Sequence, residues 1–290
     1  MKVAGFTFVR NAIKFDYPVV ESIRSVLPLC DEFVIAVGNS EDGTLKLIQN
    51  IADPKIRIIE TVWNDDLRTG GKVLAEETDK AFAAISKKVD WAFYIQADEV
   101  VHEKYYATIK NAMQKYLKDE NVEALLFNYL HFYGSYDYVA DSYDWYRREV
   151  RIVRRSIPIY SYRDAQGFRK LPNNKLTVKL IDAYIHHYGW VKDPRAMQQK
   201  QESFHKLWHD DDWVAQNVKQ AEAFDYSAIT MLHPFKGTHP KVIQQRIGAK
   251  NWPFDYDSKK NKYPLKIRLK KWIEKWTGWR VGEYRNYKIN

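Results

Sequence analysis

The prediction of the fold depends on residues 91–99, which read WAFYIQADE. The run of apolar and aromatic residues that opens this stretch predicts a buried strand. The run ends in an amide and two carboxylates, which are costly at the end of a buried strand unless they bind something. In open α/β sheets, ligands bind at the carboxyl ends of the strands. Oxygen ligands here would suit a hard divalent cation that holds a diphosphate. The alternative is a polar loop that caps the strand.

The chain before this stretch alternates predicted strands with predicted helices. Short apolar runs predict strands over 3–9, 33–37 and 56–59, and helical periodicity follows each of them. This alternation favours βαβ units and therefore a parallel sheet. All four strands end in polar or glycine-rich turns, so we expect several binding loops along one edge of the sheet.

Composition limits the classes of protein that we consider. The 290 residues are 45% hydrophobic, which is enough for a sizeable core, and aromatic residues make up 15%. The single cysteine, Cys30, rules out an internal disulfide framework and points to a reducing compartment. We find no signal-peptide pattern and no apolar run near the roughly 18 residues of a membrane span. We therefore expect a cytoplasmic protein. Its net charge of +9 implies anionic partners.

Three short motifs carry a resemblance to a known family. Arg10-Asn11 follows the first strand, residues 39–44 (NSEDGT) follow the second, and Gln96-Ala97-Asp98 follows the fourth. In this order and spacing they resemble the family 2 glycosyltransferases of GT-A fold, and bacterial members that act on surface polysaccharides look nearest. The resemblance covers roughly residues 1–190. It implies an α/β fold, a GT-A (Rossmann-like) and mostly parallel sheet flanked by helices. Residues 191–290 are expected to form a helical, basic C-terminal extension.

The resemblance also implies a site for a UDP- or GDP-linked sugar. The residues expected to bind this nucleotide sugar are Arg10, Asn11, Asn39, Asp42, Asp66, Lys72, Gln96 and Ala97. Two departures from the family pattern matter. Val37 and Gly38 replace acidic residues that help to hold uracil, and Gln96 replaces the first aspartate of the metal motif.

A divalent cation is the cofactor that the resemblance implies, with Asp98 as its ligand. GT-A enzymes often supply a late histidine as well, and a strand expected over 176–188 ends in His186 and His187. Tandem residues of a strand point to opposite faces, so at most one of the two would face the site. We favour His187. Imidazole suits Mn²⁺ better than Mg²⁺, so Mn²⁺ is preferred and Mg²⁺ is the alternative.

Transfer with inversion also needs a base that takes the proton of the acceptor hydroxyl. The resemblance places it in a loop after the strand expected over 149–155. Asp164 is the first candidate and Asp144 the second. Glu99 is expected to line the donor sugar, with a solvated loop carboxylate as the alternative.

The C-terminal tail, residues 259–290, is strongly basic and rich in tryptophan. A helix is expected over 192–222, and another over 265–276 with Leu265, Leu269, Trp272 and Trp276 in line. Basic helices with tryptophan on the apolar side often lie in the interface of an anionic membrane, here the inner face of the plasma membrane. The alternative is a helix docked on the catalytic domain, with its lysines in water.

The sequence thus favours an inverting, metal-assisted glycosyltransferase that builds a bacterial surface glycan on a glycan or lipid-linked acceptor. A nucleic-acid-binding protein is a second class, suggested by the basic, aromatic-rich composition. Its basic residues cluster in the tail, however, and no known nucleic-acid motif is present, so we expect no nucleic acid partner. A GT-A fold that has lost catalysis is a third class, because of Gln96.

Overall fold

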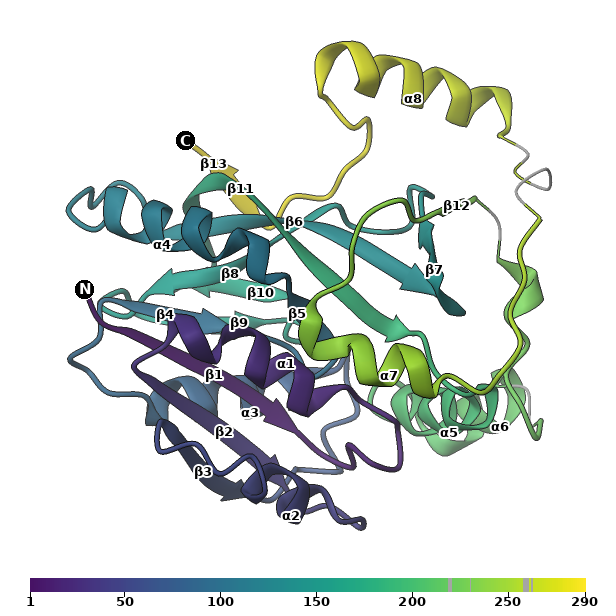
Figure 1. Cartoon of the computed structure of the whole chain (residues 1–290), viewed down its shortest axis with the longest axis horizontal. Coiled ribbons are helices and arrows are strands. Elements are labelled where there is room, and N and C mark those ends of the chain that lie inside the picture. The colour runs from purple at the N-terminus through teal and green to yellow at the C-terminus, as the bar shows by residue number, and fades with distance from the viewer. Residues whose placement is uncertain (219–220, 230, 258–260, 262) are drawn as a thin grey trace.

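The computed structural model describes residues 1–218, 221–229, 231–257, 261 and 263–290. Its first half alternates strands with helices, as the hydrophobic pattern predicts (Figure 1). The elements of this half are β1 (Val3–Val9), α1 (Val19–Val26), β2 (Glu32–Gly38), α2 (Thr44–Gln49), β3 (Ile56–Thr61), α3 (Lys72–Ala84), β4 (Trp91–Tyr94), β5 (Glu99–Val101) and α4 (Tyr106–Lys115).

The second half begins with strands, continues mainly with helices and ends with a short strand. Its elements are β6 (Ala124–Tyr133), β7 (Ser135–Ala140), β8 (Arg148–Arg154), β9 (Ile159–Tyr162), β10 (Gly167–Lys170), β11 (Asn174–Trp190), α5 (Pro194–His205), α6 (Asp211–Asn217), β12 (Leu232–Pro234), α7 (Gln244–Ala249), α8 (Leu265–Thr277) and β13 (Tyr287–Ile289). The helix predicted over 192–222 is two helices, because Asp210 starts a new one. Its side chain accepts a hydrogen bond from the backbone N–H of Trp213 at 2.7 Å, as an N-cap does.

One large sheet contains the strands in the order β3-β2-β1-β4-β8-β6-β11-β10-β9. Strands β3, β2, β1 and β4 are parallel to one another. Strand β8 runs antiparallel to both β4 and β6, and β6 is parallel to β11, so the long strands β6 and β11 share the direction of β4. The carboxyl ends of six strands therefore meet at one edge. The predicted α/β class is confirmed: the sheet is parallel from β3 to β4 and mixed beyond β4.

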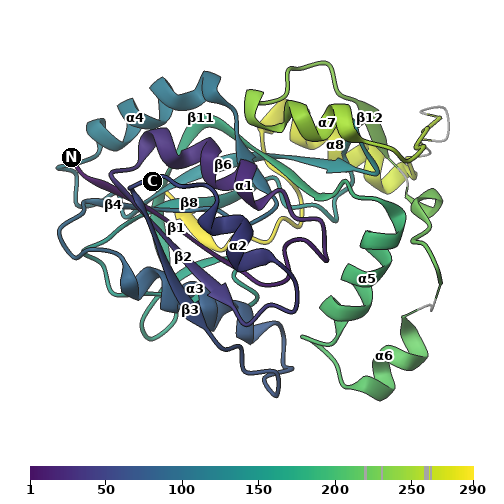
Figure 2. The ribbon, with the colours of Figure 1, turned by 60° about the horizontal axis from the view of Figure 1, so that its bottom comes forward.

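Helices cover both faces of this sheet (Figure 2). On one face, α1 and α4 bury Ile23, Val26 and Ile109 against strand residues such as Phe93. On the other face, α3 buries Val73 and Phe82 together with Phe6 and Tyr94 of the strands. Alternate strand residues feed the two cores, as the period of two in a β-strand requires. The sheet is thereby fixed as a rigid support for the loops at its edge.

The predicted boundary near residue 190 coincides with the last residue of β11. Beyond it the chain returns to the sheet, where β12 pairs with β7 and β13 pairs with β11. Helices α5 and α6 lie on the side to which the arrowheads of β1 and β11 point (Figure 1). Lys259, Lys260 and Lys262 of the predicted basic tail lie outside the described residues. In the described part of the chain, every helix is too short or too polar to cross a membrane.

Candidate functional site

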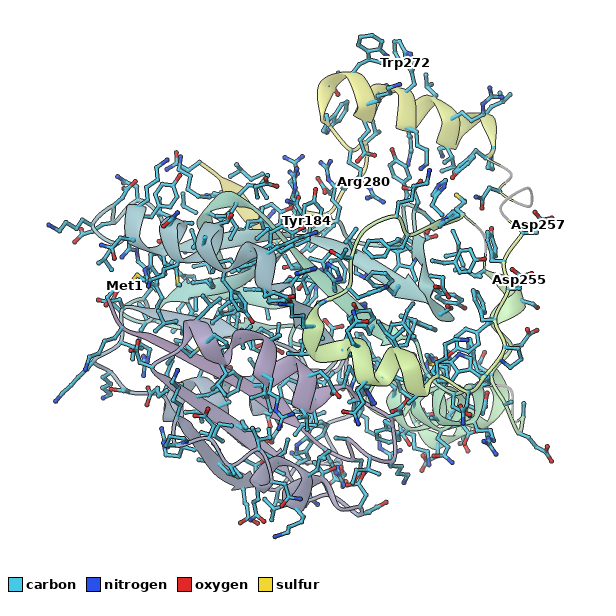
Figure 3. All side chains as sticks on the ribbon, viewed as in Figure 1. Met1, Tyr184, Asp255, Asp257, Trp272 and Arg280 are labelled. Carbon is cyan, nitrogen blue, oxygen red and sulfur yellow. The ribbon has the colours of Figure 1, made fainter. Side chains whose placement is uncertain are left out.

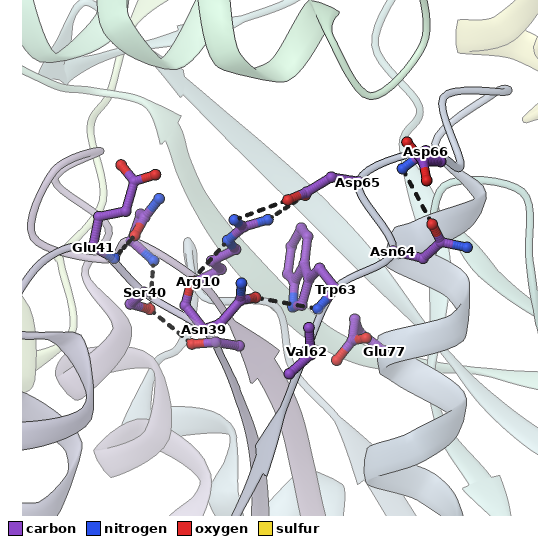
Figure 4. A network of polar contacts seen from close by, with 12 residues as sticks. Arg10, Asn39, Ser40, Glu41, Val62, Trp63, Asn64, Asp65, Asp66 and Glu77 are labelled. Atoms are coloured by element: carbon purple, nitrogen blue, oxygen red, sulfur yellow. Dashed lines mark hydrogen bonds and ion pairs between the residues drawn. The ribbon is translucent and has the colours of Figure 1, made fainter.

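Polar side chains join the loops that follow β1, β2 and β3 (Figure 4). Arg10, directly after β1, donates to the backbone carbonyl of Asn39 at 3.1 Å and to Asp65 at 2.5 and 3.3 Å. Its guanidinium also lies over the ring of Trp63, 5.5 Å from the centroid. The side-chain oxygen of Asn39 accepts from the backbone N–H of Trp63 at 3.2 Å. Arg10 and Asn39, both predicted to bind the nucleotide sugar, therefore lie together.

Two more predicted residues hold the turn after β2. Asn11, in the left-handed region with φ of +55°, accepts from the backbone N–H of Glu41 at 2.8 Å. Its own backbone N–H donates to Ser40 Oγ at 3.0 Å. The Asp42 carboxylate accepts from the backbone N–H groups of Lys14 and Thr44 at 2.8 and 2.9 Å. These contacts fix the shape of the turn from within.

A cavity of about 280 Å³ lies at the carboxyl ends of β2 and β3. Its lining residues are Val37, Gly38, Asn39, Ser40, Asp42, Leu45, Glu60, Thr61 and Val62. Val37 and Gly38, which replace the acidic residues of the family, thus lie in its wall. Glu60 brings a carboxylate from β3 to the same wall, where it can accept a hydrogen bond from a nucleobase N–H.

Asp98 lies beyond β4, where its partly buried carboxylate has basic residues around it. Its carboxylate is 3.4 Å from Lys200 Nζ, on α5, and 3.7 Å from Nε2 of His187. Burial alone would raise the pKa of Asp98, but His187, Lys200 and Lys192 outweigh it and lower this pKa to about 2. Asp98 is therefore a carboxylate at every physiological pH.

A chain of hydrogen bonds fixes the tautomer of His187. Burial lowers the pKa of both His131 and His187, which favours the neutral form of each ring. The backbone carbonyl of Tyr146 can only accept, so His131 donates to it from Nε2 at 2.6 Å. Nδ1 of His131 then accepts from Nδ1–H of His187 at 3.1 Å. This leaves a lone pair on Nε2 of His187, the nitrogen nearest to Asp98.

Gly189 allows Asp98 and His187 to lie close to the backbone of β11. A Cβ atom at position 189 would lie 2.6 Å from Asp98 Oδ2 and 2.7 Å from His187 Nε2, closer than real contacts allow. A carboxylate and an imidazole nitrogen are ligands that suit a divalent cation, and a histidine oriented by a second hydrogen bond is usual for a metal ligand.

The residues present thus fit a cation that needs further ligands from a bound molecule. The described part of the chain brings together no group of three His, Cys, Asp or Glu residues that could hold a metal by themselves. Cations of the Mg²⁺ type are usually held by one or two protein ligands plus substrate phosphates. The pair Asp98 and His187 has that character, and a diphosphate would complete the coordination.

Comparisons with known proteins give similarities of structure. No protein-family model matches the chain, and no curated protein matches it. The UDP complex of S. aureus TarS is 13% identical, with 77% of this chain and 68% of that chain covered and a TM-score of 0.41. A Mycobacterium tuberculosis glucosyl-3-phosphoglycerate synthase, in complex with Mn²⁺, UDP and phosphoglyceric acid, is 17% identical. Coverage is 45% of this chain and 43% of that chain, with a TM-score of 0.30.

A third solved structure is the mannosyl-3-phosphoglycerate synthase from Rubrobacter xylanophilus, which is 16% identical with a TM-score of 0.30. The match covers 47% of this chain and 42% of that chain. The chain thus spans less than half the length of the two synthases.

Glu99 does not line the site, which corrects the sequence prediction. Its side chain is fully buried and accepts two hydrogen bonds from the guanidinium of Arg151, at 2.7 and 2.8 Å. Tyr129 Oη and the backbone N–H of Gln96 also donate to it, at 2.7 and 3.1 Å. All of its acceptor positions are thus engaged inside the protein. Glu99 holds the loop that carries Asp98.

Asp164, the preferred base, lies in the turn between β9 and β10. Its two neighbours, Arg163 and Ala165, both have positive φ values of 57° and 63°, a strained arrangement that is common at functional sites. The Gln96 amide nitrogen donates to the carbonyl of Ala165 at 3.2 Å, which ties this turn to the Asp98 loop. Burial raises the pKa of Asp164.

Four other predicted residues take different places. Asp144 is exposed in the loop before β8, where its carboxylate accepts from Ser142 Oγ at 2.9 Å. The prediction that His186 is a metal ligand is wrong. His186 lies on the face of β11 opposite to His187, where it is fully buried with Nδ1 3.2 Å from Tyr188 Oη. Ala97 packs against the core beneath α1. Lys72, the first residue of α3, is exposed.

The sequence pointed to Asp66 in the loop after β3, whereas Asp65 is the residue that contacts Arg10. The backbone N–H of the exposed Asp66 donates to Asn64 Oδ1 at 3.1 Å (Figure 4). Sequence reasoning also missed Arg151, Gly189 and His131. A signal existed for Arg151, because an arginine inside a central strand needs a buried partner. Lys200 stands in a strongly polar stretch, so the sequence favoured a solvated helix face over a role at a phosphate.

Proposed function

We propose that the chain transfers a sugar from a UDP- or GDP-linked donor to a hydroxyl group of a glycan or lipid-linked acceptor. The reaction would proceed with inversion, in the synthesis of a bacterial surface polysaccharide. One observation carries the proposal: Asp98 and His187 face each other beside Gly189, on the sheet edge that also holds the cavity at the carboxyl ends of β2 and β3.

In this proposal the nucleobase occupies the cavity at β2 and β3, and the diphosphate extends toward Asp98. A divalent cation, Mn²⁺ or Mg²⁺, would be held by Asp98 and His187 and would neutralise the leaving nucleoside diphosphate. Lys200, whose Nζ donates to the carbonyl of Gly189 at 3.0 Å, adds a fixed positive charge beside it.

Asp164 is the residue that we propose as the base. A carboxylate whose pKa is raised by burial is better matched to accept a proton near neutral pH. The turn that carries it is bonded to Gln96, so the base and the Asp98 loop keep a fixed relative position. Asp164 would take the proton of the acceptor hydroxyl as that oxygen attacks the sugar.

Thermal unfolding with a panel of nucleoside diphosphates, with and without Mn²⁺, tests the function directly. A ligand that binds the folded state raises the midpoint by mass action. We expect UDP or GDP to raise it, and Mn²⁺ to be required. A shift without Mn²⁺ would refute the cation while leaving the nucleotide site. No shift with any nucleotide would refute the proposal and favour the nucleic-acid-binding class.

Gly189→Ala is expected to weaken Mn²⁺-dependent nucleotide binding by about 10- to 100-fold, because the new methyl group fills the volume between Asp98 and His187. Isothermal titration with the nucleotide identified above, at fixed Mn²⁺, measures the loss. Gly248→Ala is the matched control, since a Cβ at position 248 meets no heavy atom within 4 Å. Equal affinity of Gly189→Ala and the wild type would contradict the cation site.

A further inference from the structure

Helix α8 turns its apolar side away from the protein. Leu265, Leu269, Trp272, Trp276 and Trp279, at its outer side and end, are 56–80% exposed. Figure 1 shows α8 at a distance from the sheet, and Figure 3 shows Trp272 on its outer side and Arg280 on the side of the body. A helix that packs on a soluble domain normally buries its apolar side. Here the arrangement is reversed.

Polar contacts hold α8 in this orientation. Glu274 accepts from Tyr143 Oη at 2.7 Å and from Arg147 at 3.1 Å, and Lys271 pairs with Asp141. At the end of the helix, Arg147 also donates to the carbonyl of Gly278 at 3.2 Å. The helix is therefore bound through its polar side. Rotating it to bury the tryptophans would break all of these contacts.

The charge around the exposed apolar stripe selects its partner. Between Leu265 and Arg280 the chain has six basic residues and one acidic residue, Glu274. Lys266, Arg268 and Lys275 are exposed beside the stripe, whereas Glu274 faces the body. A second copy of the same face would bring like charges together. Lipid phosphates are complementary to it, and tryptophan favours the boundary between headgroups and acyl chains.

We propose that α8 binds the surface of an anionic lipid bilayer, with Leu265, Leu269, Trp272, Trp276 and Trp279 inserted at the headgroup boundary. The exposed lysines and arginines then contact the lipid phosphates. This binding is independent of the proposed function.

The position of α8 relates the membrane surface to the candidate site. The loop of residues 141–147 contacts α8 through Asp141, Tyr143 and Arg147. Its next-to-last residue, Tyr146, accepts the hydrogen bond of His131, which orients His187. The loop of residues 141–147 thus connects α8 to the histidine pair of the candidate site.

Cosedimentation of the full chain with vesicles tests the proposal. We expect binding to vesicles of mixed phosphatidylglycerol and phosphatidylcholine, at least about tenfold weaker binding to pure phosphatidylcholine, and weakening by salt. The triple variant Leu269→Ser, Trp272→Ser and Trp276→Ser should lose at least about 90% of the binding. Its affinity for the nucleotide should be unchanged. Leu171→Ser is the matched control, because Leu171 is 71% exposed outside α8.

Bromine-labelled phosphatidylglycerol gives a second measurement on the wild type, in which inserted tryptophans lose fluorescence by contact quenching. Absence of quenching would overturn the proposal even if the triple variant did not fold. Equal vesicle binding of the triple variant and the wild type would also overturn it. A third result would also overturn the proposal: a dimer of the wild type in sedimentation equilibrium that the triple variant does not form, together with no binding of the wild type to vesicles. In that case α8 would bind a second copy of the chain.

Discussion

Asp98→Asn is expected to remove Mn²⁺-dependent nucleotide binding and to lower kcat/KM by at least about 100-fold. Asparagine keeps the size of the side chain but removes the negative charge that Lys200 and His187 surround. The pKa of Asp98, about 2, means that this charge is present throughout the working pH range. Isothermal titration with and without Mn²⁺, followed by steady-state kinetics, measures both losses.

Two further variants give this experiment its controls. Glu120→Gln removes an exposed carboxylate just before β6, at the opposite edge of the sheet, and should change neither quantity. Asp164→Asn should lower kcat by about 10²- to 10⁴-fold while Mn²⁺-dependent nucleotide binding remains, since it removes a base and no ligand. If Asp98→Asn binds the nucleotide with normal affinity and dependence on Mn²⁺, Asp98 is not a metal ligand.

Glu99→Gln is expected to lower the free energy of unfolding by about 3–5 kcal/mol, a large fraction of the stability of a typical domain. The change leaves the Arg151 guanidinium, with a side chain 1% exposed, buried without its counter-charge. It also weakens the hydrogen bonds that Tyr129 and the backbone of Gln96 donate to this carboxylate. Urea denaturation followed by circular dichroism measures the loss.

The double variant Glu99→Gln with Arg151→Met separates a structural role from a catalytic one. Removing both charges should recover most of the lost stability, because the desolvation penalty of the arginine disappears with it. If Glu99→Gln is as stable as the wild type and yet inactive, Glu99 belongs to the catalytic machinery after all. That result would reverse the correction made above.

Local periodicity accounts for what the sequence predicted well. The apolar runs at β1, β2 and β4 each feed two buried faces, so strand positions follow from short windows of sequence. The shared direction of the strands then follows from the βαβ alternation. The prediction that His186 and His187 face opposite sides is likewise confirmed, because it needs only the period of two in β11.

Contacts between distant residues account for what the sequence could not predict. Glu99 and Arg151 are separated by 52 positions, and their pairing depends on β8 lying beside β4 as its antiparallel neighbour. Lys200 reaches Asp98 across 102 positions from a polar helix. A carboxylate that is bound internally and one that faces a ligand look alike in sequence, so Glu99 and Asp98 could be separated only by their partners.

Strand β13 changes how the C-terminal region has to be dissected. It pairs in parallel with β11 through Tyr287 to Ile289, and the final residue, Asn290, donates its backbone N–H to Val178 at 3.0 Å. Asn286, just before it, bonds the buried side chain of Arg169. Strand β12 pairs with β7 and β13 pairs with β11, so the segment between β12 and β13, which includes α8, is attached to the sheet at both ends. Truncating the chain at residue 259 would therefore remove β13 and its pairing with β11 together with α8. Replacing α8 by a short linker, with α7 and β13 retained, would remove α8 alone. The same two junctions would allow α8 to be replaced by another helix.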